Sequence, residues 1–398
     1  MMVSSPVPST QVVWSPALTT YNFGPSHPMA PERLALTASL AEDLGLLTSE
    51  RVSVVEPFVA SDAQLEMVHD AEFIEAVKDV SASPHSVPER GLGTEDDPAF
   101  IGMHEASARL VGGSLMLAEG MLSGELVRGV NFAGGMHHAD RGKASGFCIY
   151  NDPAVAIARL LEGGIQRVAY IDIDAHHGDG TQNIFYDDPR VLTVSLHESG
   201  MTLFPGTGYA PETGGRRAPG SAVNIAIPAY TGDAGWLRAF HAVVPQVVRA
   251  FAPQVIVSQH GCDSHIDDDL THLRTSVDAQ REAAHSIAAL ARSLCEDRWI
   301  ATGGGGYSIA NAVPRVWAHL IATVSGQALP LRTEVPQQWR ERVRARFGRE
   351  APRLMGDDAE LWWKSWEAGY NPADAVDRAI MATRKEIFPL FGLDPWFD

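Results

Sequence analysis

Short apolar runs rich in β-branched residues recur along the chain and alternate with longer segments of helical periodicity. The runs lack the apolar/polar alternation of a half-exposed strand, so they predict strands that are covered on both faces. Several of the Ala- and Leu-rich segments between them open with Asn, Asp or Pro, as helices commonly do. Strands are expected at 11–14, 127–133, 167–173, 191–196, 223–227, 254–259 and 299–302, and helices at 31–47, 105–122, 151–164, 233–251 and 278–296. Strands that alternate with helices predict an α/β fold, in which one doubly wound parallel β-sheet is flanked by helices.

The same pattern predicts a single domain over residues 1–398. A chain of this length would allow about two or three domains, but no linker or internal repeat divides the pattern. The motifs that carry chemistry fall between residues 27 and 325. The more polar span 326–398 is expected to add peripheral C-terminal helices around the sheet.

The charge balance narrows the choice of partners. The chain carries 31 Lys and Arg residues against 49 Asp and Glu residues, a formal net charge of -18. Such acidity disfavours nucleic acids and anionic membranes and suits cationic substrates better. No apolar stretch is long enough to span a membrane, and the first residues lack the pattern of an export signal. We therefore expect a cytoplasmic protein whose three scattered cysteines are free thiols.

Polar clusters follow four of the expected strands, directly after each strand ends. The strand at 127–133 is followed by GGMHHADRGKASGFCIYND and the strand at 167–173 by DAHHGDG. The strand at 254–259 is followed by HGCDSHIDDDLTHL and the strand at 299–302 by GGGGYS. In an open parallel sheet, ligands bind beyond the carboxyl ends of the strands. These clusters therefore predict one pocket supplied with His, Asp and Tyr side chains.

The stretch YIDIDAHHGDG, residues 170–180, is the densest of these clusters. In extended geometry Asp172, Asp174 and His176 share one face of the strand. A carboxylate and an imidazole two residues apart can bind one metal ion, and a catalytic zinc site takes three protein ligands and one open position. Asp174 and His176 supply two ligands, and Asp263, after another strand, is the natural third. Each residue alone would be interpreted as a cap or turn residue, but their combination at several strand ends favours a site.

The pair His137–His138 is the candidate general base, because an imidazole titrates close to neutral pH. Asp172 and Asp179 are not needed as ligands, and each could accept a proton-bearing ring nitrogen of one histidine. Tyr307 follows a run of glycines and could donate to a developing oxyanion. That run lacks a nucleotide-binding pattern. Ordinary loop histidines and a core tyrosine remain the alternative interpretation of these residues.

The motifs GGMHHADRGKASGFCIYND, YIDIDAHHGDGTQ, VLTVSLHE, LFPGTG, GCDSH and GGGGY, in this order and spacing, resemble the zinc-dependent histone deacetylase superfamily. Within it, the chain is similar to the bacterial acetoin-utilisation (AcuC-type) deacetylases, closer to the class I pattern than to class II. The resemblance covers residues 10 to 325. It implies the arginase/deacetylase-like form of the doubly wound sheet.

Carried onto this sequence, the family pattern implies a role for each motif residue. The implied zinc ligands are Asp174, His176 and Asp263. His138 is implied as the general base and acid, His137 as its electrostatic partner and Tyr307 as the carbonyl-polarising donor, with Asp172 and Asp179 orienting the histidines. The implied substrate contacts are Gly146, Phe147, Phe204, Leu270 and Gly305, and Arg33 is implied to line an acetate-release cavity. A potassium ion is implied near the zinc, at Asp172, Asp174, His176, Ser195 and Leu196.

Two segments depart from the family pattern. The rim aspartate that grips the substrate backbone lies in GLGTEDDPAF, where Asp96 or Asp97 is the match and Asp96 is favoured. The segment DSHIDDDLTHL is more acidic than its eukaryotic class I counterpart. We interpret Asp267 and Asp268 there as parts of a solvated acidic loop, as most short charge runs are.

The resemblance implies zinc-dependent hydrolysis of Nε-acetyl-lysine to lysine and acetate. The implied partner is an acetylated protein or peptide, such as a metabolic enzyme of the acetyl-CoA synthetase type. Deacetylation of a small acetylated amine, such as an acetylpolyamine, is the alternative and suits the acidity of the chain. A ureohydrolase is a further alternative, because it shares the sheet architecture and the Asp/His metal ligands, but it would need two manganese ions instead of one zinc ion. A protein that only binds acylated lysine is disfavoured because every proposed catalytic position is intact.

Overall fold

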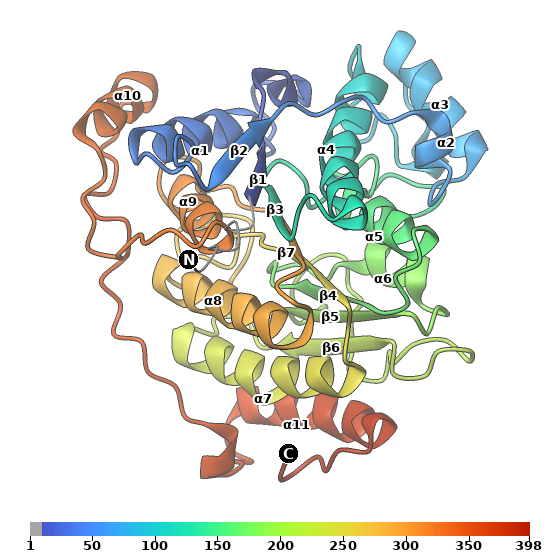
Figure 1. The fold of residues 1–398 in the computed structure, drawn as a ribbon, viewed down its shortest axis with the longest axis vertical. Helices are drawn as coiled ribbons and strands as arrows, with labels where there is room; N and C mark the ends of the chain where they lie inside the picture. Colours follow the sequence, from blue (N-terminus) through green and yellow to red (C-terminus); the bar gives the residue numbers. More distant parts are fainter. Residues whose placement is uncertain (1–9) are drawn as a thin grey trace, which may run out of the picture.

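The computed structural model describes residues 10–398, and its centre is one eight-stranded sheet in which every strand pairing is parallel (Figure 1). The strand order is β2-β1-β3-β8-β7-β4-β5-β6. The strands are β1 (Thr10–Val13), β2 (Val52–Val55), β3 (Arg128–Asn131), β4 (Val168–Asp172), β5 (Val191–Glu198), β6 (Ala222–Ile227), β7 (Val255–Gln259) and β8 (Trp299–Thr302). The prediction of a parallel α/β sheet is confirmed. All seven strands expected from apolar runs are present.

The edge strand β2 was not predicted from the pattern. It reads VSVV and pairs only with β1; its two end residues are half-buried and its two middle residues are exposed. A four-residue strand at a sheet edge carries no continuous apolar run. Its pairing with β1 therefore decides its conformation, and this pairing is not visible in the local sequence.

Helices cover both faces of the sheet (Figure 1). On one face, α4 and α5 pack together and contact β3 and β7, and α6 contacts β5. On the other face, α7, α8 and α9 form a layer in which α7 contacts β5 and α9 contacts β3. The helices are α1 (Glu32–Asp43), α2 (Asp62–Leu65), α3 (Ala71–Ala82), α4 (Met103–Ser123), α5 (Asp152–Glu162), α6 (Asp179–Phe185), α7 (Asp233–Phe251), α8 (Val277–Leu294), α9 (Ala312–Val324), α10 (Gln337–Phe347) and α11 (Ala375–Ile387). Short 3-10 helices lie at η1 (Pro16–Thr20), η2 (Pro88–Arg90), η3 (Trp366–Ala368) and η4 (Phe388–Phe391). None of the helices described is long and apolar enough to cross a membrane.

The central strands end in one row, and this row explains how distant motifs meet. Asn131 of β3 lies beside Thr302 of β8, Thr302 beside Gln259 of β7, Gln259 beside Asp172 of β4, and Asp172 beside Ser195 of β5. Because the strands are parallel and in register, the loops that follow β3, β8, β7 and β4 leave the sheet along one edge. These are the loops that carry the four polar clusters.

The C-terminal span 326–398 contains the helices α10 and α11 and the short helices η3 and η4. Of residues 326–365, only α10 is helical, and the rest crosses the surface as an irregular strap before α11. Helix α11 packs against β6 and α7 at the lower end of the view (Figure 1). There Asp377 accepts hydrogen bonds from Arg238 Nε at 2.5 Å and Nη2 at 2.9 Å, with both side chains buried. The last helix thereby covers an edge strand, which leaves less unpaired backbone in water.

Candidate metal centre and active site

Asp174, His176 and Asp263 converge at the carboxyl edge of the sheet. One ligand atom from each lies within 4.8 Å of the others. His176 Nδ1 is 2.9 Å from Asp263 Oδ2 and 3.2 Å from Asp174 Oδ1. Two carboxylates and one imidazole are a donor set that zinc accepts, and a fourth position would stay open to water or substrate. The residues present therefore fit a single divalent metal ion.

The ligand carboxylates are held by backbone and side-chain donors from neighbouring strands. Asp174 Oδ2 accepts from Gln259 Nε2 at 2.7 Å and from the Gly305 amide at 2.9 Å. Asp263 Oδ1 accepts from the Ala175 amide at 2.8 Å. Each carboxylate thus keeps one oxygen for hydrogen bonds and presents the other to His176, which is how supporting contacts orient metal ligands.

The two buried carboxylates of the ligand cluster favour a positive charge beside them. Burial, together with the charge of Asp174, raises the pKa of Asp263 to about 6. Burial alone would lower the pKa of His176, but the two carboxylates outweigh it and raise that pKa to about 10. Buried carboxylates are costly unless a cation compensates them. The electrostatics of the cluster and its donor set therefore point to the same occupant, a metal ion.

Next to the ligands, the two histidines lie against their predicted aspartates. His137 Nδ1 donates to Asp172 Oδ2 at 2.7 Å, and His138 Nδ1 donates to Asp179 Oδ1 at 2.7 Å. The two Nε2 atoms face each other at 3.1 Å. All four side chains belong to loops or ends of β4 and α6, and the histidine loop is fastened by Asn151, whose amide donates to the carbonyls of residues 137 and 139.

The histidines occupy different electrostatic environments. Burial would lower the pKa of His137, but Asp172 and Asp174 outweigh it and raise that pKa to about 9. Burial lowers the pKa of His138 to about 4, and the neighbouring His137 adds to the effect. Neutral His138 therefore has an unprotonated Nε2, which lies 3.1 Å from Nε2 of the histidine that carries the positive charge. This division suits proton transfer by His138 and charge stabilisation by His137.

Tyr307 is placed by a glycine run that passes close under the metal ligands. A Cβ atom at Gly305 would lie 2.2 Å from Asp263 Oδ2, so only glycine leaves room there. Arg33, buried behind the run, donates from Nη1 to the carbonyls of Gly304 at 3.1 Å and Gly306 at 2.9 Å. The Arg33 guanidinium also lies 5.8 Å from the centre of the Tyr307 ring. Arg33 thus supports the loop that carries the proposed oxyanion donor.

The residues predicted to contact the substrate surround the histidines and the tyrosine, where they would form the walls and mouth of a narrow tunnel for the lysine side chain. The Phe204 ring meets His138 edge-on at 5.0 Å, and the Phe147 ring meets Tyr307 edge-on at 5.8 Å. Gly146 adopts a left-handed φ of 53°, and a Cβ there would lie 2.5 Å from the His138 ring. A small cavity lies between these groups, lined by Gly146, Met29 and Cys148 as well as His137, His138, Asp174, His176, Gly305 and Tyr307.

The two candidates for the rim aspartate, Asp96 and Asp97, differ in solvent exposure. Asp97 is buried, whereas Asp96 is exposed and its carbonyl accepts from His27 Nε2 at 3.1 Å. The His27 ring in turn meets Phe147 edge-on at 4.6 Å. Only Asp96 therefore offers a carboxylate to solvent beside the tunnel, as a rim residue must, and its role remains a prediction. Leu270 is 38% exposed, which also suits a position at the tunnel mouth.

The residues of the predicted potassium site are buried and contiguous. Asp172 of β4 pairs with Ser195 of β5, and Leu196 follows in the same strand. The Ser195 hydroxyl lies 2.8 Å from His197 Nδ1. Potassium itself remains a prediction at this position.

One interpretation from the sequence is wrong. Asp268 is not solvated: it is 7% exposed and accepts from the Tyr307 amide at 2.7 Å and the Leu270 amide at 3.1 Å. Its neighbour Asp267 is exposed, as expected, and accepts from Asn311. Burial and the charge of Asp263 raise the pKa of Asp268 to about 7. The local sequence DDD gives no signal that separates the buried carboxylate from the exposed ones.

Two further polar residues at the site have supporting roles that the sequence did not indicate. Gln259, which holds Asp174, is the last residue of a predicted strand, and only the pairing of β7 with β4 reveals its role. His177 points away from the metal ligands and contacts Thr207 Oγ1 at 2.9 Å and Gln182 Oε1 at 3.1 Å. It therefore fastens the loop that carries Phe204.

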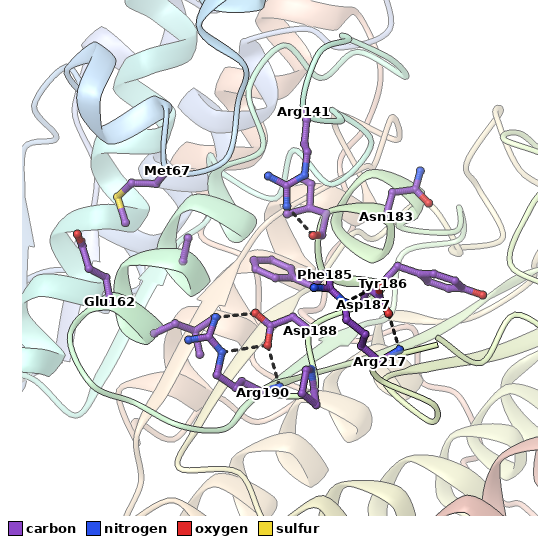
Figure 2. A pocket seen from close by; sticks show the side chains of 14 residues that line it. Met67, Arg141, Glu162, Asn183, Phe185, Tyr186, Asp187, Asp188, Arg190 and Arg217 are labelled. Carbon is purple, nitrogen blue, oxygen red and sulfur yellow. Dashed lines mark hydrogen bonds and ion pairs between the residues drawn. The ribbon is translucent and has the colours of Figure 1, made fainter. Parts of the chain in front are cut away.

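A more spacious pocket lies elsewhere and contains none of the predicted catalytic residues (Figure 2). It opens beside α5 and the segment that joins α6 to β5. Two of its arginines are already paired, Arg190 with Asp188 and Arg217 with Asp187 (Figure 2). The paired charges leave no evident binding chemistry there.

Comparisons with known proteins agree with this geometry. The family model described as "Histone deacetylase domain" matches residues 27–324. The chain is 40% identical over 380 residues to "Acetoin utilization protein AcuC" of Bacillus subtilis (strain 168), covering 94% of this chain and 97% of the relative. It is 38% identical over 355 residues to the protein of the same name from Staphylococcus xylosus, covering 88% of this chain and 91% of the relative.

Solved structures show the same fold. An HDAC homolog complexed with SAHA superposes with a TM-score of 0.81 at 26% identity, over 94% of this chain and all of that chain. An HDAC homolog from Aquifex aeolicus gives a TM-score of 0.80 at 26% identity over the same shares. With the site geometry, these matches show that the chain belongs to the histone deacetylase family of hydrolases, in the branch of its AcuC relatives.

Proposed function

We propose that this protein hydrolyses the amide bond of Nε-acetyl-lysine in proteins, with one zinc ion per chain. The observation that carries the proposal is the convergence of three elements on one small cavity: the ligand triad, of which Asp174 and His176 line the cavity, the His137–His138 pair and Tyr307. A hydrolase of this family needs a metal, a base and an oxyanion donor within reach of one carbonyl group.

Asp174, His176 and Asp263 would hold the zinc ion. When bound, zinc supplies a Lewis acid that polarises the acetyl carbonyl and makes water acidic enough to attack it near neutral pH. All remaining steps fall to side chains of this chain.

His138 is the group that moves the proton. Its Nδ1 is committed to Asp179, so Nε2 is the atom that takes a proton from the attacking water. The same atom then returns a proton to the departing lysine amine, which is too basic to leave without one. His137, held protonated between Asp172 and the metal ligands, stabilises the negative charge that develops nearby.

Tyr307 donates its hydroxyl to the carbonyl oxygen as that oxygen becomes an anion. Phe204 packs against His138 and Phe147 against Tyr307, and these two rings would enclose the lysine methylenes. Apolar walls exclude water and select a long, thin side chain, which strengthens the polar interactions at the reacting carbonyl.

Acetylated metabolic enzymes are the substrates we propose, because relatives at 36–40% identity carry the name acetoin utilization protein. An acetylated acetyl-CoA synthetase is the specific candidate, acted on in the cytoplasm, and potassium is proposed as a second, structural ion. The formal charge of -18 favours a second candidate, a small acetylated polyamine. The ratio of kcat/KM for an acetyl-lysine peptide and an acetylpolyamine decides between them.

The deciding experiment is Tyr307→Phe in the zinc-loaded protein. The variant loses one hydroxyl and no packing, so it should fold, retain zinc and lower kcat on an acetyl-lysine peptide by on the order of 100-fold. Gln166→Ala is the control and should retain full turnover, because this exposed residue precedes β4, at the end of the strand opposite to the site, and contacts Gln254 and Gly164 there. Wild-type kcat for Tyr307→Phe would refute the oxyanion role.

A further inference from the structure

Asp268 joins two parts of the site, the backbone at Tyr307 and the backbone at Leu270. It lies in the loop after β7 and is 7% exposed. One oxygen, Oδ2, accepts from the backbone amide of Tyr307 at 2.7 Å. The other, Oδ1, accepts from the backbone amide of Leu270 at 3.1 Å. A single carboxylate thus holds the backbone of the oxyanion donor and of the tunnel-mouth leucine.

The position of Tyr307 depends on hydrogen bonds to its backbone, because the glycines before it can adopt many backbone conformations. Gly304 and Gly306 have φ values of 149° and 139°, a region that other residues rarely adopt. A glycine run does not fix its own direction, so its hydrogen bonds must do so. The carbonyls are held by Arg33 and the Gly305 amide by Asp174. The Tyr307 amide is held by Asp268 alone among the residues described.

The aspartate is itself rigidly placed. Its own amide donates to the His265 carbonyl at 2.9 Å, and the His265 ring contacts Asp357 of the C-terminal strap at 2.9 Å. The loop is also tied at Thr271, whose hydroxyl donates to the Asp263 carbonyl. Asp268 is therefore held in a fixed position within the same loop that carries the ligand Asp263.

We propose that Asp268 is the positioning residue of Tyr307 and, through its second oxygen, of the tunnel mouth at Leu270. The proposal rests on the proposed function of the site. Asparagine has one acceptor oxygen instead of two, so Asp268→Asn leaves one of the two backbone amides without a partner. A displacement of about 1 Å at a catalytic group lowers turnover by on the order of 100-fold.

The test compares two variants and two substrates in the zinc-loaded full-length chain. Asp268→Asn keeps the size of the side chain, and Asp268→Glu keeps the carboxylate but moves it by one methylene. The substrates are an acetyl-lysine peptide and the same peptide with trifluoroacetyl-lysine, whose more electrophilic carbonyl needs less help from Tyr307. Asp267→Asn, the exposed neighbour, is the matched control and should behave as wild type.

Both Asp268 variants should lower kcat on the acetyl peptide by about 10- to 100-fold. The rise in KM, due to Leu270, should be smaller, about threefold. Zinc stoichiometry should be unchanged, and the loss on the trifluoroacetyl peptide should be at least several-fold smaller. In a Tyr307→Phe background, Asp268→Asn should lower kcat no further, because the group it positions is gone.

Several results would overturn the inference: wild-type kcat, an equal loss on both peptides, full rescue by glutamate, or a further loss of kcat in the Tyr307→Phe background. Failure of both variants to fold would also overturn it, because Asp268 would then be a structural residue. If the wild-type protein hydrolyses neither peptide, the proposed function itself fails, and this outcome is distinct from all the others.

Discussion

Substitution of Gly305 by alanine tests whether the backbone beside the metal ligands has room for a side chain. The Gly305 amide donates to Asp174 Oδ2, and a Cβ atom added at Gly305 would lie 2.2 Å from Asp263 Oδ2 and 3.0 Å from Asp174 Oδ2. Its φ lies outside the left-handed region, so alanine can adopt the backbone conformation there. The effect of Gly305→Ala is therefore steric alone.

The size of the effect follows from these distances. A carbon and an oxygen approach no closer than about 3.3 Å in ordinary contacts, so the Asp263 carboxylate must move by about 1 Å. Metal sites tolerate deviations of about 0.2 Å in ligand distance. Changes in the groups that merely orient a ligand already cost about 10- to 100-fold in metal affinity. We expect Gly305→Ala to weaken zinc binding by on the order of 100-fold and to lower turnover at limiting zinc in parallel.

The assay is competition for zinc with a chromophoric chelator, followed by deacetylation of an acetyl-lysine peptide and a thermal melt of the same sample. Gly232→Ala is the matched control, since a Cβ there would meet only the Arg274 carbonyl, at 3.5 Å. Wild-type zinc affinity in a folded Gly305→Ala protein would show that the glycine run does not limit the ligand carboxylates, and the steric reasoning would be wrong.

The remaining predictions concern the C-terminal helix and the metal. Asp377→Ala leaves Arg238 buried without its partner, so the free energy of unfolding in urea should fall by about 3–5 kcal/mol, whereas Asp187→Ala at an exposed pair should leave it unchanged. Burial would raise the pKa of Asp377, but Arg238 outweighs it and lowers that pKa. A carboxyl group whose pKa is lowered by folding stabilises the folded state at pH values above its ordinary pKa of about 4. This stabilisation is lost as the pH falls below that value. Wild-type stability should therefore fall more steeply than that of Asp377→Ala below about pH 4; parallel curves would contradict this. Chelation should abolish turnover and lower Tm, and zinc should restore both; turnover that survives chelation would refute metal dependence.

Much of this protein could be predicted from its sequence because the information is local. Continuous apolar runs mark strands that are buried on both faces, and the row of residues from Asn131 to Ser195 shows why polar motifs after such strands meet. Asp174, His176 and Asp263 could be nominated as ligands because carboxylate and imidazole donors are chemically distinctive and follow parallel strands. Their convergence within 4.8 Å agrees with that nomination.

Other features depend on neighbours that the chain order does not reveal. The edge strand β2 exists only through its pairing with β1. Asp96 and Asp97 are adjacent and chemically identical, yet only one reaches solvent. Asp267 and Asp268 differ in the same way, because the partner of Asp268 is the amide of Tyr307, in a loop after a different strand. Residue type and spacing determine which chemistry this protein can perform. Packing decides which of several equal carboxylates is buried against the catalytic loop, since burial depends on segments brought together by the fold.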